Sequence, residues 1–454
     1  MMTEVRPLSE ELIQEVKGLI EKKDTEALAR RIDEMQPADV ADLIEHLDHD
    51  ERLFIFQVLE PEGAGEVLVE IEPPVQGRLL EDLDDEALSE IVQELESDDA
   101  ADVIGDLPAE RARAIIQTLR GDVSEEIEKL LPYPEDTAGG IMGLEFVAVR
   151  ADATVKEAID VIRQKADEVE NLYYLWVVDI NNRLVGVISL KDLLLEPHDR
   201  KISEIMNPNV ISVNVNADQE EVVHLVKKYD LVNIPVVDDQ NRLVGRITHD
   251  DVIDVIEDEV DEDMTRIAGV IDQEITEDSP LKISRARLPW LIGGIFGELI
   301  SALVISRFES SLEKVIALSF FFPVIMAMGG NTGQQAAIIV VRGLATGDIS
   351  LMRTGKRLLT EMKVAFGNGI ICGVLLGLIV GTWLSNYELG AVVALALLMV
   401  MLNAGFIGSA VPLAFKRIGV DPALATGPFV STSNDILGLL IYLLFVTFYL
   451  RMAT

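Results

Sequence analysis

The sequence has very little cysteine, and its histidines are confined to one half of the chain. The single cysteine, Cys372, cannot form an intrachain disulfide, so an oxidising compartment is not indicated. The first 30 residues lack an apolar core, and we expect no signal peptide. The histidines stand at positions 46, 49, 198, 224 and 249, so zinc or copper sites are not expected in the C-terminal half.

Basic residues are scarce: 38 Lys and Arg stand against 78 Asp and Glu, giving a formal net charge of −40. The excess of acidic residues is confined to residues 1–283, which hold 26 basic and 70 acidic residues. Residues 284–454 hold 12 basic and 8 acidic residues. The mean hydropathy of +0.27 is nevertheless high. We interpret the chain as an acidic soluble part followed by a membrane part. This excludes a single-domain soluble enzyme, and the acidic part would repel the phosphates of nucleic acid.

A phosphate-binding loop is also missing. Gly355-Lys356 is followed by Arg357, and Ser350 stands where that motif requires its first glycine. We therefore expect neither an enzyme nor a nucleotide-driven pump.

Five segments are apolar over the roughly 20 residues that a membrane-spanning helix needs. They cover approximately residues 288–305, 315–341, 362–384, 389–415 and 423–449. We expect the second span to break at Pro323 and again over Gly329–Gln335, because non-helical backbone is tolerated where it lines a cavity. Glycines at spacing four predict close helix contacts on the first and third spans: Gly293, Gly297, Gly369, Gly373, Gly377 and Gly381.

The distribution of Lys and Arg predicts the orientation, because cytoplasmic loops carry the excess of these residues. With the N-terminus inside, nine basic residues lie on the inner side and three on the outer side. The inner set is Arg285, Arg287, Arg342, Arg353, Lys356, Arg357, Lys363, Lys416 and Arg417. We therefore predict a multi-pass plasma-membrane (cell inner membrane) protein with its N-terminus cytoplasmic and its C-terminus outside. Five spans in a single chain are few to enclose an ion pathway. We therefore predict a homodimer in the lipid membrane.

Polar residues within the spans are few, and a carboxylate near the bilayer centre costs about 2.5–3.5 kcal/mol on insertion scales. Glu298 and Asp435 are the two carboxylates well inside spans, and Asp435 follows the polar patch Ser431–Asn434. We predict that Asp435 lines a pore together with Asn331, Asn403 and Asn434. Interhelical hydrogen bonding is the alternative for the amides. Carboxylate, amide and carbonyl oxygens suit hard cations such as Mg²⁺.

Residues 36–119 contain a repeat of twelve. Its blocks begin at Gln36, Asp48, Glu60, Glu72, Asp84, Glu96 and Pro108, and positions eight and nine of each block are apolar. Prolines at 61, 73, 74 and 108 argue against one long helix. The repeat predicts short helices that stack into a solenoid, because none of them can bury its apolar face alone.

Two copies of another unit follow, over residues 175–192 and 234–251. Each is predicted to form strand, turn, strand and helix, and the matching Gly186 and Gly245 are 59 residues apart. The pair resembles a tandem CBS (cystathionine β-synthase) module. That resemblance implies a possible nucleotide site, with ATP as the candidate ligand, at Ser189, Asp192, Thr248 and Asp251. Helix capping by the hydroxyl groups is the alternative.

Nine acidic residues and no basic residue occupy positions 250–263. Val252, Ile253, Ile256 and Val260 form an apolar stripe at helical spacing, so the segment is predicted to be a helix. Like charges three and four residues apart destabilise a helix by tenths of a kcal/mol per pair, and divalent cations would relieve the repulsion. We therefore interpret the run as a cation site, and a solvated surface is the alternative.

This order of segments resembles the MgtE family of magnesium channels over the whole chain. The most specific motifs are Gly329–Gln335, Gly419–Ala423 and Ser433–Asp435. The resemblance implies a homodimeric Mg²⁺ channel for uptake that cytosolic Mg²⁺ closes, with Asp435 as the pore carboxylate. It also implies that these acids bind regulatory Mg²⁺: Asp98, Asp102, Asp230, Asp251, Asp254, Glu257, Glu259, Glu262 and Asp263. Glu298 does not match the family pattern.

The resemblance and the residue patterns together predict five domains. These are an acidic helical solenoid (1–136), two CBS units of α+β type (137–202 and 203–262), a connecting plug helix (263–283) and a five-helix transmembrane domain (284–454). Two other functions stay open. One is an ion-coupled divalent cation exporter or exchanger, which would couple flux to Na⁺ or H⁺. The other is a membrane-anchored nucleotide sensor that transports nothing.

Overall fold

A computed structural model describes residues 9–165, 169, 171–268, 279–345, 349, 354–423 and 428–452. The chain forms two compact units, Met1–Ile256 and Glu257–Thr454. The first unit holds the helical domain and the paired CBS units, and the second holds the membrane helices. The predicted multidomain architecture is confirmed.

Ten short helices form the N-terminal domain. They are α1 (Glu10–Lys22), α2 (Thr25–Ile32), α3 (Pro37–Glu45), α4 (His49–Phe56), α5 (Pro61–Val69), α6 (Pro73–Asp82), α7 (Asp85–Val92), α8 (Ser97–Gly105), α9 (Ala109–Ile116) and α10 (Gly121–Leu130). From α3 to α9, each block of twelve residues contributes one helix, so the predicted repeat is confirmed.

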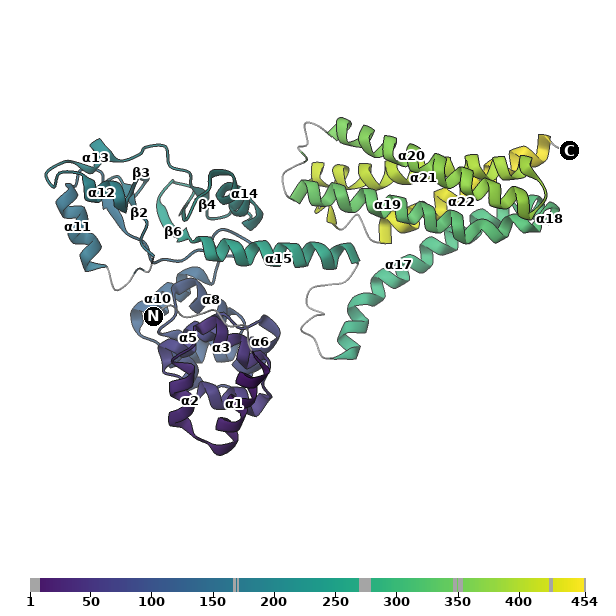
Figure 1. Ribbon diagram of the computed structural model, residues 1–454. Helices are drawn as coiled ribbons and strands as arrows, with labels where there is room; N and C mark the ends of the chain where they lie inside the picture. Colours follow the sequence, from purple (N-terminus) through teal and green to yellow (C-terminus); the bar gives the residue numbers. More distant parts are fainter. Residues whose placement is uncertain are drawn as a thin grey trace. The chain divides into compact units, whose positions relative to one another are not determined.

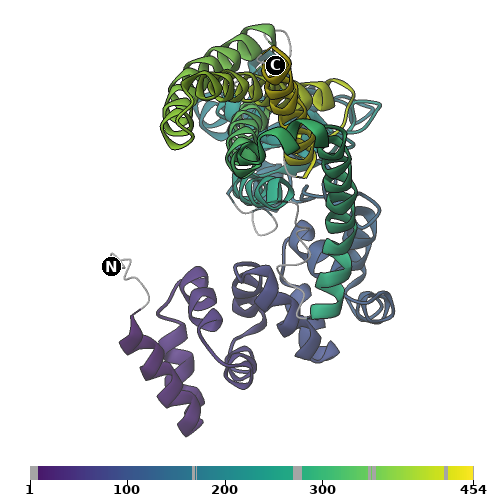
Figure 2. The same ribbon diagram turned by 90° about the vertical axis from the view of Figure 1, so that its right-hand side faces the viewer.

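The repeat folds this way because each block carries its own start signal and its own apolar pair. Proline occupies the first turn of α3, α5 and α6, and Asp84 accepts a hydrogen bond from Ala87 N at the start of α7. Most of the apolar pairs, such as Leu43 and Ile44, are buried. Alternate helices pack against each other, as α3 on α5, α5 on α7 and α7 on α9, and the helices stack in sequence (Figure 2).

The two CBS units each contain a three-stranded sheet. The first has strands β1 (Ala148–Arg150), β2 (Tyr174–Val178) and β3 (Leu184–Ser189), with helices α11 (Val155–Gln164), α12 (Leu190–Leu195) and α13 (Ile202–Ile205). The second has β4 (Val213–Asn214), β5 (Ile234–Val237) and β6 (Leu243–Ile247), with α14 (Gln219–Tyr229) and α15 (His249–Ala268). In each sheet the first strand is parallel to the second, and the second is antiparallel to the third.

The two hairpin turns join the CBS units reciprocally. Asn182 and Asn241 both have positive φ, which asparagine tolerates better than most residues. Asn182 Nδ2 donates to Leu243 O at 3.3 Å, and Asn241 Nδ2 donates to Leu184 O at 3.0 Å. The predicted tandem arrangement therefore closes into a pair with matching contacts.

The second unit is built from helices that are mainly apolar. They are α17 (Pro280–Arg307), α18 (Glu309–Lys314), the 3₁₀ helix η1 (Ile316–Phe321), α19 (Phe322–Ala345), α20 (Thr354–Trp383), α21 (Tyr387–Arg417) and α22 (Pro428–Met452). Among the described residues, five helical segments are long and apolar enough to cross a membrane, which confirms the five predicted spans. Helix α21 packs against α19, α20 and α22 (Figure 1).

Two expectations about the spans need correction. Backbone geometry changes from 3₁₀ to α just before Pro323, but α19 continues unbroken through Gly329–Gln335. The glycines serve packing instead, since a Cβ at Gly333 would meet Asn434 and Val430 of α22. On the first span only part of the glycine pattern is used, because a Cβ at Gly297 would meet Thr432 whereas Gly293 faces open space.

Of the connecting helix predicted for residues 263–283, residues up to Ala268 continue α15, and residues from Pro280 belong to α17. Residues 269–278 lie outside the described part of the chain.

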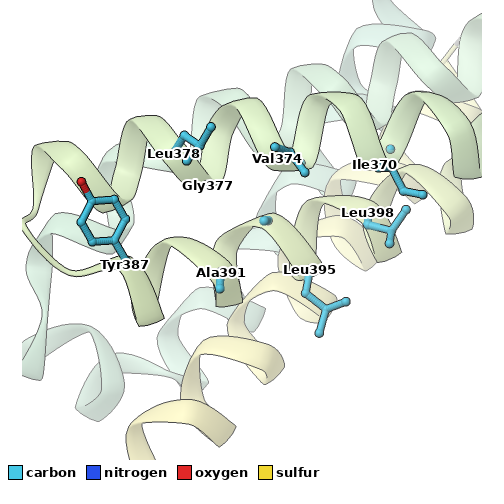
Figure 3. A pocket seen from close by; sticks show the side chains of 11 residues that line it. Ile370, Val374, Gly377, Leu378, Tyr387, Ala391, Leu395 and Leu398 are labelled. Atoms are coloured by element: carbon cyan, nitrogen blue, oxygen red, sulfur yellow. The ribbon is translucent and has the colours of Figure 1, made fainter.

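The glycine ladder of the third span brings α20 close to α21. A Cβ at Gly373 would lie 2.7 Å from Ala394 O, and one at Gly377 would lie 2.7 Å from Gly390 O. Beside this contact the two helices leave an apolar groove of about 400 Å³, flanked by Ile370 and Leu398 (Figure 3). Small residues thus let the two backbones meet in lipid.

We expect Gly377→Ala to destabilise the membrane unit by about 1–3 kcal/mol, because the new methyl group overlaps a backbone oxygen. Gly367→Ala on the same helix is the matched control, since nothing lies within 4 Å of its Cβ position. Thermal unfolding in detergent checks this. Equal midpoints for the two variants would show that the ladder does not set the helix spacing.

Candidate metal sites

Helix α8 presents a run of carboxylates to the second CBS unit. The run Glu96-Ser97-Asp98-Asp99 covers the N-cap and the first residues of α8, and Asp98 is only 8% exposed. A Cβ at Gly143 would lie 2.9 Å from Asp98 Oδ2 and 3.0 Å from Glu145 Oε2. Because Gly143 has no side chain, the Asp98 and Glu145 oxygens can converge beside it.

Glu96, Asp98 and Glu145 form a cluster whose ligand oxygens all lie within 4.8 Å of one another. Glu145 is held by Ser97, whose backbone N and Oγ both donate to its carboxylate at 2.9 Å. Ser97 Oγ in turn accepts from Leu144 N at 2.8 Å. Three converging carboxylates with such fixed positions suit a hard divalent cation.

Arg246 supplies one positive charge beside this cluster. Its side chain extends from β6, is 3% exposed, and places Nη2 3.3 Å from both carboxylate oxygens of Glu96. Asp251 lies in the first turn of α15 and accepts hydrogen bonds from Thr248 N at 2.7 Å and from Thr248 Oγ1 at 2.6 Å. One guanidinium offsets only part of the negative charge gathered here.

Burial and mutual repulsion raise the pKa values of the acids around α8. Burial raises the pKa of Asp98 well above its ordinary value, and Asp251, Asp99, Glu145 and Glu96 raise it further. Burial, then Asp251, raises the pKa of Asp99 to about 7.

The same effects reach the next turn of α8 and the start of α15. Burial, followed by Glu135, raises the pKa of Asp102 to about 7. Burial also raises the pKa of Asp251, and the hydrogen bonds from Thr248 oppose this. A cation among these groups would favour their charged forms.

The structure brings together Asp98, Asp102 and Asp251 of the predicted regulatory acids, and Asp254 contributes to the raised pKa of Asp99. Asp230 lies apart, as the left-handed C-cap of α14. Sequence reasoning missed Asp99, which belongs to the same acidic run, and Glu96 and Glu145.

Further along α15, Glu257 is exposed and Glu259 is half-buried. Glu262 pairs with Arg266, and Arg266 Nη1 lies 2.5 Å from Oδ2 of Asp421 in the loop before α22. The side chain of Asp263 lies outside the described part of the structure. Part of the acidic helix is thus balanced by arginine instead of requiring a cation.

The candidate nucleotide residues are engaged in capping. Ser189 Oγ accepts from Asp192 N at 3.1 Å and donates to Asp192 Oδ2 at 2.7 Å at the start of α12. Thr248 and Asp251 repeat this pairing at α15. Asp192 is exposed, whereas Asp251 also belongs to the acidic cluster, so only the first pair is readily accessible to a ligand.

In the membrane unit, Asp435 of α22 lies within hydrogen-bonding reach of Glu298 of α17. The neighbouring Asn434 is 2% exposed, and neither atom of its amide has a hydrogen-bond partner among the described residues. Asn403 on α21 likewise has a buried Nδ2 without a described partner.

Asn331 lies in a different place. It lines a pocket of about 190 Å³ between α19, α20 and α21, together with Asn368 and Cys372. Asp435 is not among the residues that line this pocket. Asn434 directly precedes Asp435 on α22, whereas Asn331 lies in this separate pocket.

Comparison with known proteins accounts for this combination of domains. Residues 322–445 match the family model for the MgtE divalent cation transporter, residues 35–136 match the MgtE intracellular N domain, and residues 138–199 and 202–258 match the CBS domain. The magnesium transporter MgtE of Enterococcus faecalis is 40% identical over 326 residues, which is 72% of each chain. The chain belongs to the MgtE family. The Thermus thermophilus magnesium transporter MgtE is 42% identical over 323 residues, covering 70% of this chain and 71% of that protein.

Solved structures agree with the family assignment. A crystal structure of the cytosolic domain of the Mg²⁺ channel MgtE in complex with ATP aligns with a TM-score of 0.51 and 38% identity, covering 54% of this chain and 99% of that one. The soluble part of a magnesium transporter aligns with a TM-score of 0.50 and 32% identity, covering 55% and 98%. This MgtE chain is thus a multi-pass membrane protein of a magnesium transporter family.

The raised pKa values predict a pH dependence. Asp99 and Asp102 titrate near 3.8 in the unfolded chain and near 7 when folded, so the folded form binds more protons between these values. Without Mg²⁺, the stability of the α8 contact should therefore fall as pH rises from about 4 to about 7 and change little above that. Hydrogen exchange of α8 amides should speed up between about pH 5 and pH 7 beyond the intrinsic increase, and Mg²⁺ should reverse this at about pH 7.

Helices α3 and α5 serve as the reference for this exchange experiment, since they lie outside the acidic contact. If α8 and the reference helices responded equally to pH and Mg²⁺, the acids around α8 would be ordinary surface groups.

Proposed function

We propose that this MgtE protein is a homodimeric Mg²⁺ channel for uptake that closes when cytosolic Mg²⁺ binds its acidic cytosolic unit. The observation that carries the proposal is the convergence of Asp98, Asp99, Asp102 and Asp251 from α8 and α15, with pKa values raised by burial and repulsion. Such a set costs free energy when ionised and is relieved by a bound divalent cation. The proposal involves no chemical reaction.

The helix α15 offers a physical connection between the acidic cluster and the ion pathway. Asp251 lies in its first turn, and Arg266 lies in its last turn. Arg266 pairs with Asp421, which precedes α22, and α22 carries Asp435. When Mg²⁺ holds Asp251 against α8, the position of one end of this continuous helix is fixed, and the other end acts on α22.

When Mg²⁺ is scarce, the carboxylates of α8 and α15 repel each other and the contact loosens. The pathway is then free to open. Uptake needs no other energy source, because the membrane potential supplies about 4.6 kcal/mol per 100 mV for a divalent cation. This favours a channel over an ion-coupled exporter or exchanger.

Asp435 is the proposed site of ion passage. Mg²⁺ gives up its water reluctantly and prefers octahedral oxygen coordination, so the ion is held in largely hydrated form by the carboxylate. A second copy of the chain would bring a second Asp435 to a shared axis. The excess of basic residues on the predicted inner side supports an N-terminus in the cytoplasm and a C-terminus outside the plasma membrane.

ATP is proposed as a ligand of the CBS pair, supported by the related cytosolic domain that was crystallised with ATP. Asp192 fits the role of a ribose acceptor, because it is exposed and needs only to release Ser189 Oγ. A membrane-anchored nucleotide sensor without transport would also bind ATP, so ion flux separates the two functions.

Asp435→Ala should reduce Mg²⁺ flux into liposomes at least about tenfold, since a charged contact with the ion is worth about 1.5–3 kcal/mol. Asp435→Asn keeps the shape and should also lose divalent selectivity. The dimer should stay folded, as judged by size-exclusion chromatography. Wild-type flux through a folded Asp435→Ala protein would move the pathway elsewhere.

Neutralising Asp98, Asp102 and Asp251 together, each to Asn, should raise the internal Mg²⁺ concentration that closes the protein at least about tenfold. The control variant changes Asp50 to Asn and both Glu62 and Glu66 to Gln, which removes equal charge from exposed positions. Flux at stepped internal Mg²⁺ is the measurement. If both triple variants closed at the wild-type concentration, Asp98, Asp102 and Asp251 would not be the sensor.

A further inference from the structure

Glu298 is a membrane carboxylate that the function proposed so far does not use. It lies in the middle of α17, the first span, and it is exposed on the surface of the single chain. An ionisable side chain at such a depth is costly against lipid, and such residues almost always face a polar cavity or pair with one another. Its position therefore requires an explanation.

The packing of α17 on α22 fixes what Glu298 faces. A Cβ at Gly297 would meet Thr432, and beyond the end of α17 Ser311 Oγ of α18 lies 3.0 Å from Thr447 Oγ1 of α22. The chain from α17 into α18 therefore runs in the same direction as α22, with Gly297 of α17 beside Thr432. This register places Glu298 beside the turn of α22 that carries Asp435, and the two side chains are within hydrogen-bonding reach.

A second, independent feature lies at the same level. Ser301 is one turn beyond Gly297 on α17, so it lies on the same face of the helix, the face that packs against α22. It is 2% exposed, and its Oγ has no hydrogen-bond partner among the described residues. A buried hydroxyl without a hydrogen-bond partner is destabilising, so such a group points to a ligand in the adjacent space.

We propose that Glu298 and Asp435 together bind the permeating divalent cation, with Ser301 Oγ as a further oxygen. Glu298 is then a second carboxylate of the ion pathway and helps to set its preference for divalent over monovalent cations. This inference rests on the proposed ion passage at Asp435. Beyond that proposal, it assigns Glu298 of the first span to a direct contact with the ion or with its water shell.

The chemistry of the set fits a hydrated Mg²⁺. Two carboxylates and a hydroxyl from each copy of the chain offer only oxygen ligands, which a hydrated divalent cation prefers. Ionised carboxylates this close repel each other, and a cation between them relieves the repulsion. A divalent cation relieves more of it than a monovalent cation does, which is the proposed source of selectivity.

Labelling tests the site without relying on transport. A membrane-permeant carbodiimide modifies carboxyl groups within the bilayer, and mass spectrometry measures its adduct at Glu298 in the full-length reconstituted protein. We expect Mg²⁺ to reduce the labelling of Glu298 at least about fivefold relative to Na⁺ at equal ionic strength. Asp435→Asn should abolish this protection. Equal labelling with Mg²⁺ and Na⁺ in the wild type would overturn the proposal.

Flux measurements provide the second test. Glu298→Gln should raise the external Mg²⁺ concentration for half-maximal flux by about tenfold and lower the ratio of Mg²⁺ to Na⁺ flux. Glu298→Asp should restore most of both, and Glu309→Gln, an exposed acid of α18, should match the wild type. Unchanged concentration dependence and selectivity in a folded Glu298→Gln protein would contradict the role.

The two experiments separate this inference from the proposed function. If the wild type carried no Mg²⁺ flux but Mg²⁺ still protected Glu298, the channel function would fail while the site would stand. If the wild type carried flux and Mg²⁺ gave no protection, the site would fail while the channel function would stand.

Discussion

Uncompensated negative charge that is held out of water is the constraint on which the rest of this protein depends. Around α8, burial and mutual repulsion raise the pKa values of Asp98, Asp99 and Asp102. Arg246 supplies one positive charge there, which is too little to balance the set. The folded cytosolic unit is therefore poised to respond to protons and to divalent cations.

The same constraint recurs in the membrane unit, with a different outcome. Arg266 balances Glu262 and Asp421, and Arg357 balances the buried Glu361. Those acids are fixed by arginine and have no need of an ion. Asp435 faces another carboxylate instead, and that difference is the basis for proposing it as a place where a cation binds.

Sequence periodicity was sufficient to predict the helical repeat, the paired CBS units and the five spans, because each depends on patterns within a few tens of residues. Contacts between distant residues were harder to predict. Glu145 joins Ser97 from 48 residues away, and no local pattern marks it. The Gly329–Gln335 segment was predicted to break because of its composition, yet it stays helical because every backbone group in lipid must be bonded and Gly333 packs against Asn434.

Magnesium uptake by wild-type protein in liposomes, with internal Mg²⁺ stepped and no gradient of Na⁺ or H⁺, tests the account most directly. An inside-negative potential alone should drive uptake, and uptake should fall steeply as internal Mg²⁺ rises, because Mg²⁺ occupies the acidic contact between α8 and α15. Uptake that needed a Na⁺ or H⁺ gradient, or that did not depend on internal Mg²⁺, would contradict a channel closed by its own ion.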